Sequence, residues 1–300
     1  MTRANGVADH GDLAAAHTAA PTPGPQAAAA RAAVIRAIET CDVALAAWEA
    51  GSAAFGRADL SSDVDVSVIA TGGPGTGTAV LDAIEEELAE LTDLELWDVG
   101  ESMFGVQRFW QPAQPGPDAP MCMVDVSVLD RETDADKLRE LLTPERHGRA
   151  LVMHDPDGVL AETLAANMFD AEAHRARITS ELDRLRARQN MFASFGPKEL
   201  ERDRLLDAHW IHHGMVVVPL VALLGMVHRP LRFDFGLRYL HDEFPADLVE
   251  CLEPIVEPGR ERLAAAIAEG VGWVDSLLDD IDPDLLPIER HAAEMRAAFA

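Results

Sequence analysis

Two aspartates separated by one residue are the groups best placed to do chemistry. Asp63 and Asp65 flank a valine at the start of a β-type apolar run. Because side chains alternate along a strand, both carboxylates should point to one face while the neighbouring valines point into a core. Carboxylates that share a face repel each other unless a cation lies between them. Oxygen ligands suit Mg²⁺, which water and substrate phosphates usually complete, so this pair predicts a metal site.

A third carboxylate is available later in the chain. Asp125 stands alone in the run Met121–Val128, on one face with Met123 and Ser127, while Cys122, Val124 and Val126 share the other face. If this strand neighbours the first one, three aspartates form one cluster. Such a cluster can hold two ions about 3.5–4 Å apart, the geometry used for in-line displacement at phosphorus.

A Gly-Ser pair precedes the first aspartate by about ten residues. Gly51 and Ser52 should form a turn that opens a short helix. The free N–H groups and the dipole at the start of a helix favour phosphate. The order Gly-Ser, Asp-x-Asp, lone Asp therefore suggests a phosphate group beside metal ions. The competing interpretation is that Asp63 and Asp65 form the solvated face of an edge strand.

These motifs together resemble the nucleotidyltransferase superfamily (polymerase-β-like), and most closely its small-molecule branch, which includes the kanamycin and lincosamide nucleotidyltransferases. The resemblance covers roughly residues 30–160 and, more loosely, the helical remainder. It implies that Asp63, Asp65 and Asp125 bind two Mg²⁺ ions and carry the catalysis. It also implies that the nucleoside triphosphate is held by Gly51 and Ser52, with Arg57 and Ser62 as further candidates.

The chain departs from the family pattern at one position. The family often has an arginine just before the glycine that follows Gly-Ser, where this chain has Phe55 and carries an arginine at Arg57 instead. Either Arg57 takes over the phosphate contact or that contact is missing.

Composition limits the class of partner. The chain has 300 residues, which favours two domains, and a formal net charge of −27 with only two lysines. This charge argues against long nucleic acid, whose phosphates require clustered Lys and Arg. It favours a small cationic acceptor drawn to an acidic cleft. The three cysteines are far apart, and neither a secretory signal nor a membrane-spanning segment is expected, so we predict a cytoplasmic protein with reduced thiols.

The order of patterns along the chain predicts an α/β (α+β) fold. We expect a disordered tail over 1–27, a nucleotidyltransferase domain over 28–162 with a small mixed sheet and flanking helices, and a helical bundle over 163–300 that binds the acceptor. In the first domain we expect, in this order, a helix, a strand, the Gly-Ser helix, the strand with the metal-binding aspartates, a helix and three strands. Two further polar clusters have structural interpretations: Asp155 and Asp157 as a turn, and His209 and His213 as packing rather than a zinc site.

The expected activity is Mg²⁺-dependent transfer of a nucleoside monophosphate from an NTP, such as ATP, to a hydroxyl of a small, antibiotic-like acceptor, with release of pyrophosphate. One alternative is a toxin–antitoxin-like nucleotidyltransferase that acts on protein or RNA. Another is a catalytically silent nucleotide-binding module. The sequence does not predict the oligomeric state.

Overall fold

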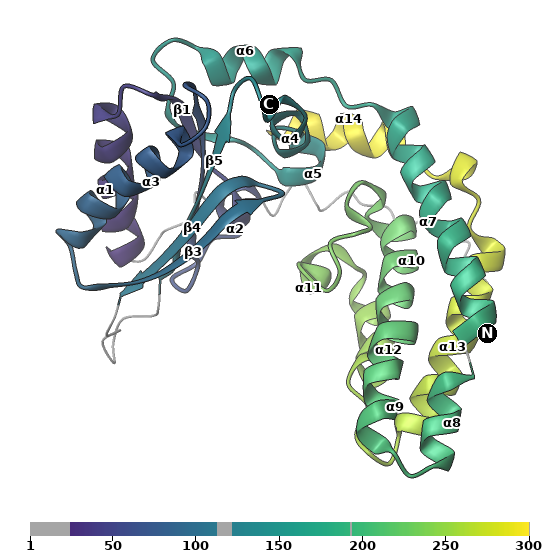
Figure 1. The fold of residues 1–300 in the computed structure, drawn as a ribbon. Coiled ribbons are helices and arrows are strands. Elements are labelled where there is room, and N and C mark those ends of the chain that lie inside the picture. Colours follow the sequence, from purple (N-terminus) through teal and green to yellow (C-terminus); the bar gives the residue numbers. More distant parts are fainter. Residues whose placement is uncertain (1–24, 113–121, 193, 300) are drawn as a thin grey trace. The chain divides into compact units, whose positions relative to one another are not determined.

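The protein is described here from a computed structural model that covers residues 25–112, 122–192 and 194–299. It divides into two compact units (Figure 1). Residues 25–169 with 295–299 form the sheet unit, and residues 170–294 form the helical unit. The boundary predicted between residues 162 and 163 stays a prediction, as does the tail over 1–24, which lies outside the described residues.

The described residues up to 169 form six strands and six helices in an order that agrees with the sequence prediction. They are α1 (Pro25–Thr40), β1 (Ala44–Glu49), α2 (Gly51–Ala54), β2 (Val64–Ala70), α3 (Thr76–Ala89), β3 (Leu94–Ser102), β4 (Gly105–Pro112), β5 (Val124–Asp130), α4 (Ala135–Leu141), α5 (Pro144–His147), β6 (Leu151–His154) and α6 (Val159–Ala166). The predicted fold class, a small mixed sheet with flanking helices followed by a helical region, is confirmed.

Two boundaries in this unit differ from the prediction. Helix α1 begins at Pro25, so residues 25–27 are helical rather than part of a tail. The spacing of Val80, Leu81, Ile84, Leu88 and Leu91 predicts a helix over 79–91, but helix α3 begins at Thr76. The prolines of residues 111–120 predict a loop, which lies almost entirely outside the described residues.

The strands are arranged in the order β3-β4-β5-β2-β1-β6. Strands β2 and β5 pair in parallel, and every other described pair is antiparallel. Strand β2, which follows Asp63 and contains Asp65, therefore lies inside the sheet. The interpretation of these two aspartates as the solvated face of an edge strand is wrong.

The two faces of the central strands have different cover. The valines of β2 and β5 pack with α1 and α3 in one apolar core, which is why these alternate residues are apolar. On the other face, Ile69 and Leu129 at the carboxyl ends of the strands are buried with residues of α4 and α6. The residues before them on this second face are polar, so the start of both strands offers a polar surface.

The described residues of the helical unit form a series of helices. They are α7 (Ala171–Phe192), α8 (Phe195–Glu201), α9 (Leu205–His212), the π-helical η2 (His213–Val217), α10 (Val218–His228), η3 (Pro230–Arg232), α11 (Leu240–Glu243), α12 (Ala246–Val256), α13 (Leu263–Asp280), η4 (Pro283–Leu285) and α14 (Ile288–Phe299). The last residues of α14 belong to the sheet unit.

Helices α9, η2 and α10 form one continuous helix, which contains Pro219. The π-helical turn ends at Val217, two residues before this proline, whose missing N–H removes one hydrogen bond from a regular helix. By length and composition, Leu205–His228 could cross a membrane, although no spanning segment was expected. Since 56% of its apolar window is buried in the protein, and the core helix of a soluble protein passes the same test, this is weak support for a span.

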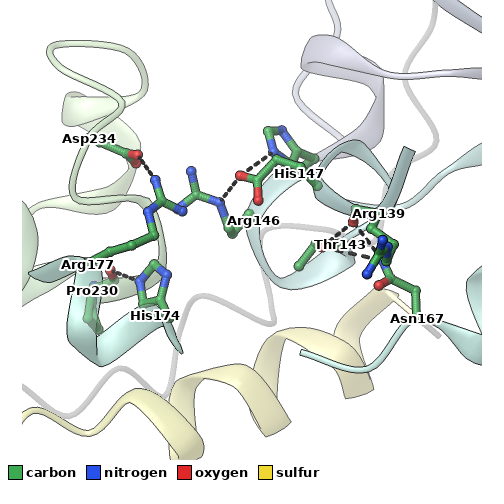
Figure 2. A network of polar contacts seen from close by, with 10 residues as sticks. Arg139, Thr143, Arg146, His147, Asn167, His174, Arg177, Pro230 and Asp234 are labelled. Carbon is green, nitrogen blue, oxygen red and sulfur yellow. Dashed lines mark hydrogen bonds and ion pairs between the residues drawn. The ribbon is translucent and has the colours of Figure 1, made fainter. Parts of the chain in front are cut away.

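Polar contacts at the start of α7 tie it to the chain that follows α10. Figure 2 shows the His174 ring beside the Pro230 carbonyl, at 2.9 Å, and Arg177 donating to Asp234 at 2.7 Å. Asp234 lies 57 positions after Arg177, so this ion pair joins segments that are distant in the sequence.

The turn interpretation of Asp155 and Asp157 agrees with the structure, whereas the packing interpretation of His209 and His213 is not supported for His213, whose side chain is exposed. The Asp155 carboxylate accepts the backbone N–H groups of Leu160 and Ala161, at 3.1 and 3.0 Å, and so closes the turn before α6. Among the histidines near residue 210, His212 is buried and bonds to the Ile255 carbonyl at 2.7 Å. Burial lowers the pKa of His212, which keeps the ring neutral.

Candidate active site

The two aspartate strands carry the same five residues, Val-Asp-Val-Ser-Val. In the parallel pair β2–β5 each residue of 64–68 lies beside its counterpart in 124–128. Asp65 is therefore the register partner of Asp125, and Ser67 that of Ser127. The two serine hydroxyls are buried and lie 3.0 Å apart, which confirms that both strands present these side chains on one face. The repeat in the sequence is a signal for this pairing.

Asp63 lies just before β2 on the same face. Its carboxylate accepts the backbone N–H of Met123 at 2.9 Å, immediately before β5. The structure therefore brings all three predicted aspartates to the start of two adjacent strands, each partly exposed. The predicted adjacency of the two strands is confirmed, and the role of the three aspartates as metal ligands stays a prediction.

Gln107 on β4 is a functional candidate that the sequence analysis did not identify. Its side-chain amide donates to both carboxylate oxygens of Asp125, at 2.8 and 3.1 Å. Gln107 is 7% exposed, so the contact is shielded from water. The alternation of β4, in which Gln107 and Phe109 share a face, is the only sequence signal for it, and that signal is weak.

The environment of Asp125 favours its protonated form. Burial and, to a smaller extent, the nearby charge of Asp63 raise its pKa to about 6, against the hydrogen bond from Gln107, which lowers it. A carboxyl group in this position gains from a nearby cation, because the cation offsets both the burial and the repulsion from Asp63.

Gly51 lies directly against Asp65. Its φ of +59° belongs to the left-handed region that favours glycine, and a Cβ at this position would lie 1.6 Å from Oδ2 of Asp65. The backbone N–H of Ala50 also donates to the Asp65 carbonyl, at 2.8 Å. The Gly-Ser helix, α2, therefore begins beside the central carboxylate, as the motif order predicted.

The position where the family often has arginine is a packing position in this chain. Phe55 is 3% exposed and meets the Phe299 ring edge-on, with ring centroids 6.0 Å apart. The guanidinium of Arg57 lies over the Phe55 ring, 5.3 Å from its centroid, and the Arg57 N–H donates to the Ser52 carbonyl at 2.9 Å. Phe55 thus fixes the end of α2, and Arg57 lies next to the Gly-Ser turn.

Ser62, the last of the predicted nucleotide-binding residues, is used within a turn. Its hydroxyl accepts the N–H of Asp59 at 2.8 Å and donates to the carboxylate of the same residue at 3.0 Å. This turn lies immediately before Asp63, so Ser62 helps to position the start of β2.

A salt bridge supports the other side of the Gly-Ser turn. Glu49, the last residue of β1, is 5% exposed and accepts Nε of Arg31 at 2.7 Å, with a second contact from the same guanidinium. This buried pair joins α1 to the strand end that leads into Gly51. A lone glutamate at the end of an apolar run was its only sequence signal.

The three aspartates lie at one end of β2 and β5 but do not form a preformed metal-binding group. Across the described residues, no three His, Cys, Asp or Glu side chains are grouped so that they could hold a metal ion. Asp63 and Asp125 are each held by a donor from the adjoining strand, Met123 and Gln107 respectively. The donor set is all oxygen and fits Mg²⁺, which needs only one or two carboxylates when phosphates and water complete its shell.

Comparison with known proteins adds no family assignment. No family model matches the chain, and no curated protein matches it either.

Proposed function

We propose that this chain is a Mg²⁺-dependent nucleotidyltransferase that moves a nucleoside monophosphate from an NTP, such as ATP, to a hydroxyl of a small acceptor. The observation that carries the proposal is the pairing of the two Val-Asp-Val-Ser-Val strands, which sets Asp65 beside Asp125 with Asp63 at the same end. Neighbouring strands lie about 4.8 Å apart, so carboxylates in register can share a bound cation.

Each part of the site has a role in this reaction. Asp63, Asp65 and Asp125 would hold Mg²⁺, which supplies charge neutralisation for the phosphates. Gly51 leaves room beside Asp65, and Ser52 and the N–H groups at the start of α2 would hold the triphosphate. The acceptor oxygen forms a bond to the α-phosphorus, the bond from that phosphorus to the bridging oxygen breaks, and pyrophosphate leaves. The hydroxyl proton passes to water. The chain contributes mainly positioning and electrostatic stabilisation.

A binding measurement tests the metal assignment. Replacement of Asp63 and Asp65 together by asparagine should reduce the affinity for a non-hydrolysable ATP analogue in the presence of Mg²⁺ at least tenfold by calorimetry, because two anionic ligands are lost. Asp136→Asn, which changes a charge on an exposed helical surface, is the matched control. Unchanged binding in the double variant would exclude this function.

A labelling experiment tests the acceptor class. With [α-³²P]ATP and candidate acceptors, label should appear on a small molecule. Label on protein or RNA would favour the toxin–antitoxin-like alternative. Retained nucleotide binding without any transfer of label would favour a silent nucleotide-binding module.

A further inference from the structure

A row of four side chains crosses the sheet at the level of the aspartates. Trp97 on β3 is the register partner of Phe109 on β4, Phe109 that of Asp125, and Asp125 that of Asp65. Directly paired residues in neighbouring strands present their side chains on the same face. The row therefore reads aromatic, aromatic, carboxylate, carboxylate across one surface.

The two aromatic rings form a flat, accessible surface. The rings of Trp97 and Phe109 are stacked, with centroids 5.3 Å apart and planes inclined by 25°. Trp97 is 67% exposed, although it is a large apolar side chain on an edge strand. Exposure of such a side chain to water is unfavourable, and exposed apolar patches often mark binding surfaces. A stacked pair that stays exposed can receive a third ring on its open face.

The order of these four residues places the aromatic surface on the nucleophile's side of the carboxylates. Gly51 and the start of α2 adjoin Asp65, so the triphosphate lies on that side of the carboxylates. The aromatic pair lies on the other side, beyond Asp125. In an in-line displacement the nucleophile approaches opposite the leaving group. The aromatic pair is therefore next to the nucleophile and away from the departing pyrophosphate.

We propose that Trp97 and Phe109 form the acceptor platform, on which an aromatic ring of the acceptor stacks with its hydroxyl directed toward Asp125. This inference rests on the proposed function and narrows its substrate class to alcohols or phenols that carry a planar ring. It places one face of the acceptor on the sheet unit, whereas the sequence analysis assigned acceptor binding to the helical part.

The chain offers a matched control for the platform. Leu96 lies on the same edge strand, is 49% exposed and pairs with Trp110 in the next row, so its side chain lies on the opposite face from Trp97. Leu96→Ala therefore reports any general effect of weakening the edge strand. Trp97→Phe keeps a ring at the platform and should rescue the function lost in Trp97→Ala.

The test uses the full chain and two probes of similar size, 4-nitrobenzyl alcohol and cyclohexylmethanol, in saturation-transfer NMR without Mg²⁺ or nucleotide. The planar alcohol should bind, and cyclohexylmethanol several-fold more weakly. Trp97→Ala should weaken binding of the planar alcohol about tenfold, as expected for loss of one stacking partner. Trp97→Phe and Leu96→Ala should stay within about twofold of the parent chain, a difference of about 0.4 kcal/mol.

Several results would overturn the platform. Equal binding of the two alcohols, or no binding of the planar one, would exclude stacking. A tenfold loss of affinity for the Mg²⁺–ATP analogue in Trp97→Ala, with alcohol binding unchanged, would assign the rings to the nucleotide base instead. A dimer of the parent chain that Trp97→Ala converts to a monomer would assign the surface to a second copy. Because the alcohol probes need no metal, their binding is independent of the test with the two aspartate substitutions.

Discussion

The side-chain amide of Gln107 donates to both carboxylate oxygens of Asp125, and this contact joins β4 to the carboxylate pair of β2 and β5. Gln107 is neutral, so it orients the carboxylate without supplying the charge that a cation would. A metal ion can then approach a carboxylate whose rotation is already restricted.

Gln107→Ala should lower the proposed transferase activity about tenfold while leaving the fold intact, because loss of an outer-shell partner of a metal ligand costs about 10–100-fold. The matched control is Gln111→Ala, which removes an exposed amide from the same strand where it bonds to Glu95 at 2.7 Å. Activity and thermal unfolding should be measured for both variants. Equal activity in the two variants would show that orientation of Asp125 by Gln107 is unimportant.

Asp125→Asn should stabilise the metal-free protein at neutral pH. The pKa of Asp125 is about 6 in the folded chain, above its ordinary value, so the folded state binds the proton more tightly than the unfolded state does. The resulting stabilisation is complete below the unfolded pKa and is lost as pH rises through 6. The asparagine side chain stays neutral, so the variant keeps this stabilisation. Its free energy of unfolding should exceed that of the parent chain by about 1–3 kcal/mol at pH 7.5.

Urea unfolding with a chelator, at pH 4.5 and 7.5, measures this difference. The free energies of unfolding of the two chains should be closest at the lower pH and diverge at the higher one. A difference that does not change with pH would contradict the assigned environment of Asp125.

Gly51→Ala should impair the site more than it impairs the fold. A Cβ would collide with the Asp65 carboxylate and would also occupy a strained backbone conformation, at a cost of about 1–3 kcal/mol. Gly73→Ala is the control for the strain alone, because its φ of +79° is similar and nothing lies within 4 Å of its Cβ. We expect similar unfolding temperatures for the two variants, and at least tenfold weaker Mg²⁺–nucleotide binding only for Gly51→Ala.

Phe55→Ala should destabilise the sheet unit by about 3–5 kcal/mol, the usual cost of removing a buried aromatic ring. Phe299→Ala removes the partner ring, and the double variant should cost less than the sum of the single ones because the two rings contact each other. Denaturant titration of the parent chain, the two single variants and the double variant gives the free energies of unfolding for this double-mutant cycle. Strict additivity would show that the ring contact contributes nothing.

The parts of the site that depend on local periodicity could be predicted from sequence. A strand alternates faces every residue, so the common face of Asp63 and Asp65 follows from their positions alone, whereas that of Asp125 also requires the pairing of β2 with β5. The repeated Val-Asp-Val-Ser-Val segment goes further and indicates the register. This explains why the element order and the neighbourhood of the three aspartates agree with the structure.

The parts that depend on pairing between distant segments could not be predicted. Gln107 meets Asp125 only because β4 and β5 pair antiparallel with a particular register, and no property of Gln107 itself indicates that pairing. The role of Phe55 depends in the same way on Phe299, which is 244 positions later in the chain. A family pattern made this position look like a missing phosphate contact, whereas its burial explains the residue type.

The return of residues 295–299 to the sheet unit has a consequence for biosynthesis. The buried carboxylate of Glu145 takes its partner Arg296 from this segment, whose guanidinium also donates to the Asn167 carbonyl at 3.0 Å. A ribosome makes all of residues 170–294 before these partners emerge. The sheet unit therefore cannot complete its packing during translation in the usual order, N-terminal unit first, and until then Glu145 and Phe55 remain without the contacts that α14 supplies.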